Sequence, residues 1–230
     1  MVIRSRLIRY SQALRWRLLR WKYRHSAFTG RFDWDWVQTP YDRVALVSRL
    51  VCSYNLTRYL EIGCRHDTLF RAVGCQHKVG VDPHSGGTHR MTSDEFFAIC
   101  TDEYDLVFVD GLHEHEQVWR DVSNALQHVP VGGFIVIHDL LPRTWQEQHV
   151  PRLQQAWTGD VWKVAFDILE TPGLGFEIVL VDHGLGVVRK LEAGVALGRS
   201  SACRRSAGFP YLYENIGRLP LVSWKTWVAR

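Results

Sequence analysis

Four short apolar runs, each ending in a glycine or an aspartate, constrain the fold of this chain more than any other feature. They cover residues 59–63, 78–82, 104–110 and 133–139, and a stretch long enough for a helix, residues 113–128, separates the last two. Strand, helix, strand at this spacing predicts parallel strands joined by right-handed crossovers. Because the runs are apolar throughout, we expect helices on both faces of the sheet.

The flanking segments complete the predicted architecture. A helix is expected at residues 41–54, after Pro40, and another at residues 160–169. Residues 176–182 and 185–190 are joined by His-Gly and predict an antiparallel hairpin. The predicted fold is therefore α/β: a Rossmann-like, doubly wound and mostly parallel sheet with a C-terminal antiparallel hairpin and an N-terminal helical arm.

The N-terminal arm carries the positive charge of the chain, whose formal net charge is +4. The first 32 residues contain no acidic and nine basic side chains: Arg4, Arg6, Arg9, Arg15, Arg17, Arg20, Lys22, Arg24 and Arg31. Removing these nine from the 28 basic residues of the chain leaves 19 against 24 acidic residues. The body is therefore mildly acidic, which argues against nucleic acid as its partner.

An apolar stripe runs along the same arm. Its members recur at spacings of three and four, which places them on one face of a helix: Ile3, Leu7, Tyr10, Leu14, Leu18 and Trp21. A stripe of this length needs a cover, and the alternatives are the body of the same subunit, a second subunit or a membrane surface. We expect a protein cover in a homodimer, while the arginines also suit peripheral contact with anionic lipid.

The composition of the chain indicates the cellular location in which the protein is expected. No apolar run approaches the roughly 18 residues of a membrane span, so no transmembrane segment is expected. The basic N-terminus lacks a continuous apolar core and a small-residue cleavage site, which argues against a signal peptide. The five cysteines are scattered, without a CxxC pair: Cys52, Cys64, Cys75, Cys100 and Cys203. We therefore expect reduced thiols and a cytoplasmic location.

Two residues at strand ends indicate a ligand that contains a ribose. Gly63 ends the first run, where the chain has to turn tightly beneath a ligand. Asp82 ends the second run at the carboxyl edge of the sheet, where an acid can accept hydrogen bonds from both ribose hydroxyls. Gly63 is the only glycine in residues 61–67, so the glycine fingerprint of a dinucleotide site is absent.

Glu61, Gly63 and a following strand that ends in Asp82 resemble motifs I and II of the class I S-adenosylmethionine-dependent methyltransferases. The resemblance covers residues 58–190 and continues through TSDEFF, FVDGLHEHEQVWRDV, GGFIVIHDLLP and GDVWK. This series is similar to bacterial metal-dependent sugar O-methyltransferases of antibiotic and polysaccharide pathways. That branch often has a glycine where this chain has Asp67, so the loop beneath the methionine moiety is expected to differ.

The resemblance implies a site for S-adenosylmethionine as cofactor. Glu61 and Gly63 would contact the methionine moiety of the cofactor, and Asp82 would contact its ribose. Ser93 and Asp94, in the TSDEFF segment, would contact the adenine.

Asp110 and Asp139 end two runs that we expect to be neighbouring strands, so both carboxylates should emerge at the same edge of the sheet. His138 precedes Asp139, and Gly111 frees a turn that brings His113 to the same place. Carboxylate oxygens with a histidine nitrogen suit a hard divalent ion such as Mg²⁺. We predict Asp110, His138 and Asp139 as ligands of an ion that orients the acceptor and lowers the pKa of the attacking hydroxyl.

Methyl transfer to a hydroxyl requires that a proton leave the attacking oxygen, and a neutral histidine suits that role. The resemblance implies a histidine just after the aspartate of the third run, a position that matches His113, so His113 and Asp110 are the predicted catalytic residues. In the plainer alternatives, His113 caps the crossover helix and His138 is a buried core histidine. His115 and Glu116 are expected to be solvated helix residues.

We therefore expect an S-adenosylmethionine-dependent O-methyltransferase that acts on a hydroxyl of a saccharide. Its methyltransferase domain would span residues 55–190, between the arm with its lead-in helix at 1–54 and a docked aromatic tail without a clear period at 191–230. Three alternatives stay open. They are an oxidoreductase with a nucleotide cofactor, which the missing glycines disfavour, a nucleic-acid methyltransferase that uses the basic arm, and a non-catalytic interaction module.

Overall fold

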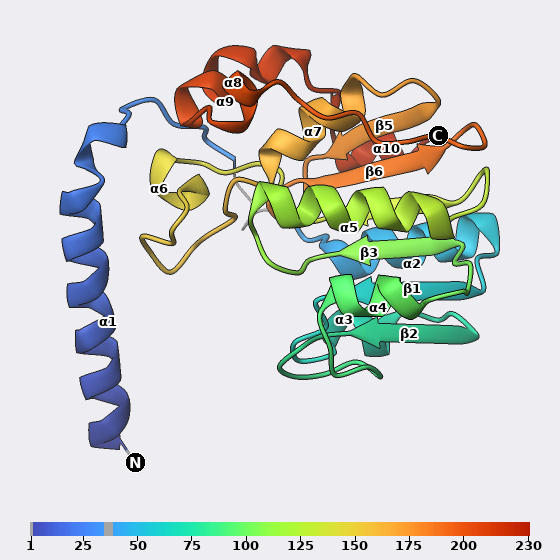
Figure 1. The fold of residues 1–230 in the computed structure, drawn as a ribbon, viewed down its shortest axis with the longest axis horizontal. Coiled ribbons are helices and arrows are strands. Elements are labelled where there is room, and N and C mark those ends of the chain that lie inside the picture. Colours follow the sequence, from blue (N-terminus) through green and yellow to red (C-terminus); the bar gives the residue numbers. More distant parts are fainter. Residues whose placement is uncertain (1, 35–38) are drawn as a thin grey trace.

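A seven-stranded sheet forms the centre of the computed structural model, which describes residues 2–34 and 39–230 and, in the first helix, the side chains from Gln12 onward. The strands are β1 (Arg58–Ile62), β2 (His77–Val81), β3 (Leu106–Val109), β4 (Phe134–Ile137), β5 (Leu174–Val179), β6 (Leu185–Lys190) and β7 (Leu221–Val222). Their order is β2-β1-β3-β4-β6-β5-β7. All are parallel except β6, which runs antiparallel between β4 and β5. The predicted parallel sheet with a terminal hairpin is confirmed (Figure 1).

Helices cover both faces of the sheet because both faces are apolar. The helices of the body are α2 (Arg43–Tyr54), α3 (Thr68–Ala72), α4 (Ser93–Ile99), α5 (His115–His128), α6 (Trp145–Gln148) and α7 (Trp162–Leu169). Neighbouring strand residues pack into opposite clusters: on β1, Tyr59 belongs to the cluster under α2 and α3, and Leu60 to the cluster under α4, α5 and α7. This alternation explains why the strands are apolar at every position.

The last forty residues contain more regular structure than their sequence suggests. They form α8 (Ala202–Arg205), α9 (Phe209–Asn215), the 3₁₀ helix η2 (Ile216–Arg218), β7 and α10 (Trp224–Val228). Strand β7 pairs with β5 and extends the sheet. Each element is too short to show a period, so its structure depends on packing against the body rather than on local propensity.

The N-terminal arm forms helix α1 (Val2–Lys22), followed by the 3₁₀ helix η1 (Arg24–Ser26). In Figure 1, α1 stands beside the body, and the chain after it leads toward α9. Phe28 packs there against Phe209 and Tyr213, with ring centroids 5.9 and 5.3 Å away. The aromatic tail therefore receives the segment that follows the arm. No helix among the described residues is long and apolar enough to cross a membrane.

The face of α1 that meets the body is not the predicted one. Leu19 and Tyr23 pack against the main core cluster, and Arg20 donates a hydrogen bond to the Leu153 carbonyl. Leu14 and Leu18, which belong to the predicted stripe, are exposed instead. Trp21 of this stripe is exposed too, and Ile3, Leu7 and Tyr10 lie outside the described side chains. The body of the subunit, one of the covers that the sequence left open, does not cover the described part of this stripe. Periodicity identifies an apolar face but not its partner.

Candidate active site

The turn after β1 places Gly63 against the end of β3. Gly63 has a φ of +92°, and its N–H donates to the Val81 carbonyl at 2.9 Å. A Cβ atom on Gly63 would lie 2.1 Å from the carbonyl oxygen of Asp110. A glycine is therefore required here both by the positive φ and by the close approach of the two strand ends.

Replacing Gly63 with alanine should destabilise the protein more than the same change at Gly132, which has a φ of +90° but open space around it. Gly132→Ala introduces only the strain of a positive φ, about 1–2 kcal/mol. Gly63→Ala adds the overlap with Asp110, so we expect a total loss of about 2–5 kcal/mol. Urea denaturation measures both losses, and equal losses would contradict the close approach.

Asp67, in the turn after β1, has a backbone conformation that favours glycine. Its φ is +60°, a left-handed value that aspartate tolerates better than most residues. The Asp67 carboxylate accepts a hydrogen bond from the Gly87 N–H at 2.7 Å. The Asp67 carboxylate therefore links the loop after β1 to the loop after β2.

Asp82 lies at the carboxyl end of β2, as predicted, and is buried. One of its oxygens accepts hydrogen bonds from the N–H groups of His84 and Ser85, and the other accepts one from Arg65 at 2.9 Å. Burial opposes ionisation of Asp82, but these three N–H groups outweigh it and lower the pKa of the carboxyl. Asp82 is thus an ionised acceptor that orders the loop over the edge of the sheet.

Glu61 is buried within β1 and accepts a hydrogen bond from the Tyr59 hydroxyl at 2.6 Å. Burial raises the pKa of Glu61 to about 7, although the Tyr59 hydrogen bond opposes this shift. Its charge near neutral pH is therefore sensitive to its surroundings. A nearby ammonium group, such as the amino group of a methionine moiety, would favour the ionised form.

Ser93 and Asp94 open α4 and are held by side chains of α5. The Ser93 hydroxyl donates to Asp121 at 2.6 Å, and the Gln117 amide donates to both Ser93 and Asp94. Asp121 is buried, its Oδ2 has no hydrogen-bond partner in the described structure, and burial raises its pKa to about 6. Asp121 was not predicted as a site residue, although an acid on the apolar face of α5 was a usable signal.

The predicted catalytic residues meet at the carboxyl ends of β3 and β4, which are neighbours in the sheet. His113 bridges two carboxylates: its Nδ1 lies 2.9 Å from Asp139 Oδ2 and its Nε2 lies 3.4 Å from Asp110 Oδ1. One ligand atom from each of Asp110, His113 and Asp139 lies within 4.8 Å of the others. Among the described residues, this is the group that could hold a metal ion.

His138 is buried beneath the same two carboxylates. Its Nδ1 lies 3.1 Å from Asp110 Oδ1 and 3.2 Å from Asp139 Oδ1. Burial by itself lowers the pKa of His138, but the two aspartate charges outweigh it and raise this pKa well above its ordinary value. The group that could hold a metal therefore contains His113 in place of the predicted ligand His138.

Two further charged residues complete the cluster. Arg43, the first residue of α2, donates to Asp110 at 2.6 Å and to Asp182 at 2.7 Å. Asp182 follows β5, which runs parallel to β4, so its carboxylate reaches the same edge of the sheet as Asp110 and Asp139. Neither Arg43 nor Asp182 was predicted as a site residue, although the strand-end rule that identified Asp110 and Asp139 also applies to Asp182.

The protonation state of His113 depends on its two carboxylate neighbours. Burial lowers the pKa of His113, but the hydrogen bonds to Asp110 and Asp139 outweigh it and raise this pKa to about 9. The ring can accept a proton at neutral pH only when another cation compensates these carboxylates. Trp157 stacks on the imidazole with a centroid distance of 5.2 Å and an interplanar angle of 8°, which fixes the plane of the ring.

Comparison with known proteins agrees with the motifs and with the fold. Residues 51–140 match the model of a family described as a methyltransferase domain. The structure is similar to that of the O-methyltransferase TomG from Streptomyces achromogenes, involved in tomaymycin synthesis and solved with S-adenosylmethionine. That similarity has 15% identity and a TM-score of 0.51, over 65% of this chain and 80% of TomG.

A second similar structure is cofactor-bound Rv0187 from MTB, with 16% identity and a TM-score of 0.52, over 70% of this chain and 84% of that one. No curated protein matches the sequence significantly. At these identities the structural matches define the fold, and the family match adds the methyltransferase motifs. The resemblance to the class I S-adenosylmethionine-dependent methyltransferases is thereby confirmed, in the sequence of residues 51–140 and in the fold of the larger part of the chain.

Proposed function

We propose that the protein transfers a methyl group from S-adenosylmethionine to a hydroxyl of a sugar or oligosaccharide, with a divalent ion, such as Mg²⁺, and a histidine base. The observation that carries this proposal is the bridge that His113 makes between Asp110 and Asp139. The backbone of Asp110 also contacts the Gly63 turn, so the proposed catalytic groups lie beside the proposed cofactor loop. We take this reaction to occur in the cytoplasm, as the unpaired cysteines suggest.

The residues that we propose to bind the cofactor follow the carboxyl edge of the sheet. Glu61 and Gly63 would hold the methionine moiety, and Asp82 would accept hydrogen bonds from the ribose. Ser93 and Asp94 would border the adenine, where the buried Asp121 holds the Ser93 hydroxyl. The low pKa of Asp82 supports its role, because an ionised acceptor binds hydroxyl donors more strongly than a neutral one.

The donor set fits a hard divalent cation. Two ionised carboxylates and an imidazole offer ligand atoms within 4.8 Å of one another, and oxygen-rich sets of this kind suit Mg²⁺ or Mn²⁺. We assign Asp110 and Asp139 as ligands and leave His113, the third member of this group, uncoordinated as the base. His138, predicted as a ligand, is assigned instead to hold both carboxylates from beneath, because its Nδ1 already contacts them. When bound, the ion would supply Lewis-acid polarisation of the acceptor oxygen.

Residues of the chain would then transfer the proton and hold the catalytic groups in place. His113 takes the proton of the acceptor hydroxyl once the charge of Asp110 and Asp139 is compensated. Trp157 holds the plane of its ring, and Arg43 neutralises Asp182 at the base of the site. Incubation with labelled S-adenosylmethionine and a panel of saccharides, with and without Mg²⁺, tests this function. Label transfer to oligonucleotides but not to saccharides would overturn the proposed acceptor class.

Asp82→Ala should weaken the binding of S-adenosylhomocysteine. Each ribose hydrogen bond to a charged acceptor contributes about 1.5–3 kcal/mol, so the affinity should fall by at least about tenfold. The loop that Asp82 organises through Arg65, His84 and Ser85 would also lose its order. Isothermal titration calorimetry measures the affinity, with Asp105→Ala as a control, since Asp105 also accepts backbone hydrogen bonds but lies before β3. Unchanged affinity in Asp82→Ala would refute the assignment of the ribose site.

A further inference from the structure

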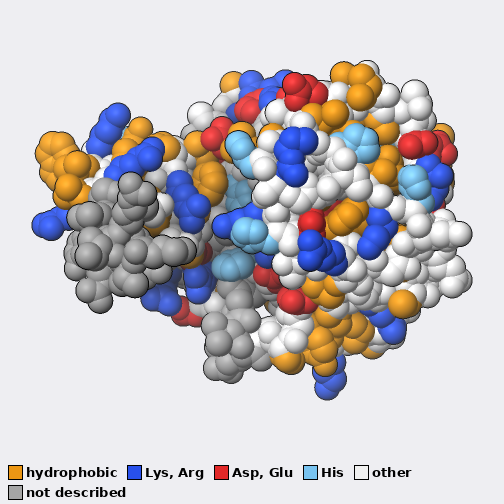
Figure 2. All heavy atoms as spheres, turned by 90° about the horizontal axis from the view of Figure 1, so that it is seen from below, with side chains coloured by type: hydrophobic (Ala, Val, Ile, Leu, Met, Phe, Trp, Pro, Cys, Tyr) orange, Lys and Arg blue, Asp and Glu red, His pale blue; other side chains and the backbone are white. Residues whose placement is uncertain are grey.

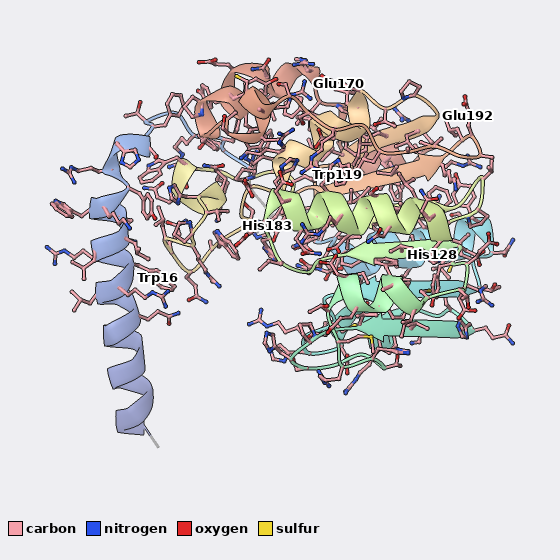
Figure 3. All side chains as sticks on the ribbon, in the orientation of Figure 1. Trp16, Trp119, His128, Glu170, His183 and Glu192 are labelled. Atoms are coloured by element: carbon pink, nitrogen blue, oxygen red, sulfur yellow. The ribbon has the colours of Figure 1, made fainter. Side chains whose placement is uncertain are left out.

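Helix α1 has two apolar faces, and among the described side chains only one of these faces meets the body of the subunit. Trp16, Leu19 and Tyr23 lie on the inner face, toward the body, and Figure 3 shows Trp16 on that side. Leu14 and Leu18 lie on the opposite side of the helix, with 59% and 60% of their surface exposed. Trp21 joins them at 67% exposed. We call Leu14, Leu18 and Trp21 the outer face of α1.

Basic side chains border the outer face on both sides. At about 100° per residue, Arg17 flanks it on one side, and Arg15 and Lys22 flank it on the other. No acidic residue occurs in the first 32 positions, and among the described side chains neither Arg15 nor Arg17 contacts an acid. In Figure 2, hydrophobic and basic side chains stand side by side on the projecting arm at the left.

We infer that the outer face of α1 docks on an anionic lipid surface. Leucine side chains and a tryptophan with basic residues on both sides are typical of helices that lie in the membrane interface. The basic residues would contact lipid phosphates, and each adds attraction to an anionic membrane. The body of the subunit already uses the inner face, so docking leaves the fold unchanged.

A second copy of the chain, within a homodimer, is another surface that could cover the outer face. Packing two outer faces together would bring the rows of Arg15, Arg17 and Lys22 from both copies into proximity. Like charges at that distance repel, whereas anionic lipid attracts the same residues. The charge pattern therefore favours lipid over a second arm, and the dimer becomes an outcome of the test.

The inner face connects the docked helix to the active site. The guanidinium of Arg152 lies 5.9 Å from the centroid of the Trp16 ring and 5.7 Å from that of Trp157. Trp157 in turn stacks on His113. Lipid docking itself is independent of the proposed function. Its consequence, that an acceptor at the membrane surface would reach His113 beside the docked arm, rests on that function.

Co-sedimentation of the full chain with vesicles tests the inference without any assay of activity. Vesicles of phosphatidylcholine containing phosphatidylglycerol should bind the protein at physiological salt, and pure phosphatidylcholine vesicles should bind it at least about tenfold more weakly. Leu14→Glu with Leu18→Glu should lower binding to the anionic vesicles by at least about tenfold. The control is Ile99→Glu, since Ile99 on α4 is 68% exposed but far from the arm in sequence and on another element.

Reversing the charge of two arginines beside the outer face gives a second variant that tests lipid docking. Arg15→Glu with Arg17→Glu keeps the outer face apolar and should also lower binding by at least about tenfold. Failure of the wild type to bind anionic vesicles, or equal binding of the Leu14 and Leu18 double variant, overturns the inference. Analytical ultracentrifugation measures the oligomeric state and so tests the remaining alternative. A dimer that the double variant dissociates, without vesicle binding, would assign the outer face to a second copy.

Discussion

Replacing His113 with glutamine is expected to lower the turnover number of methyl transfer by about 10²–10⁴, the usual contribution of one general base. Glutamine can keep a hydrogen bond to Asp110 or Asp139, but it cannot accept the proton of the attacking hydroxyl. The affinity for S-adenosylhomocysteine should not change, because the loops around Gly63 and Asp82 are untouched. Steady-state kinetics and calorimetry measure the two quantities, and the loss should appear in turnover more than in KM.

His138→Gln is the matched comparison for this experiment. His138 is buried against the same carboxylates, at 3.1 Å from Asp110 and 3.2 Å from Asp139, but lies beneath them. We expect its replacement to reduce stability and metal affinity more than the proton-transfer step. If His113→Gln keeps near-normal turnover while His138→Gln loses it, the base is His138.

The pH dependence of unfolding gives an independent readout on His113. The pKa of His113 is about 9 in the folded protein without metal, whereas the ordinary pKa of a histidine is 6.5. Because the folded value is the higher one, the contribution of His113 to stability is fully present below pH 6.5 and is lost as the pH rises through 9. The free energy of unfolding of chelator-treated protein should fall over this range. It should fall less in His113→Gln, and identical pH profiles would contradict the bridge.

The convergence of Asp110 and Asp139 at one edge of the sheet could be predicted from sequence by one rule. Parallel strands end at the same edge of a sheet, so Asp110 and Asp139, each at the end of an apolar run, had to lie close together if their strands were neighbours. The pairing of Val109 with Ile137 fulfils that condition. The same rule also applies to Asp182, the last residue of the predicted strand at residues 176–182, but no role was assigned to it.

Other parts of the site depend on distances that a periodic pattern does not contain. Arg43 lies 67 positions before Asp110, and only the packing of α2 on the sheet brings its guanidinium to that carboxylate. The pattern on α1 predicted a helix but not its docked side, because Trp16 and Leu19 supply a second apolar face. The local sequence thus predicts the central helices and strands, while contacts between side chains on distant elements assemble the site.

Replacing Asp139 with asparagine is expected to abolish methyl transfer without unfolding the protein. Asp139 has a φ of +65°, which asparagine tolerates, and the side chains have nearly the same shape. The amide oxygen carries no net charge and therefore binds a hard cation more weakly than a carboxylate does. A bound ion contributes several kcal/mol to such a reaction, so the rate should fall by at least about 10³-fold. Titration with Mn²⁺, circular dichroism and label transfer measure the three effects.

Asp182→Asn provides a control that matches Asp139→Asn in nearly every respect except the proposed coordination. Asp182 also has a positive φ, of 43°, and also lies near His138, at 3.4 Å from its Nε2. Its carboxylate is neutralised by Arg43 and is not in the group that could hold a metal. We therefore expect Asp182→Asn to lose stability but to keep Mn²⁺ binding and most of its turnover. Mg²⁺ should restore the chelated wild type and Asp182→Asn, but not Asp139→Asn. Full activity of the wild type after exhaustive chelation would remove the ion from the reaction and leave Asp139 as a partner of His113 alone.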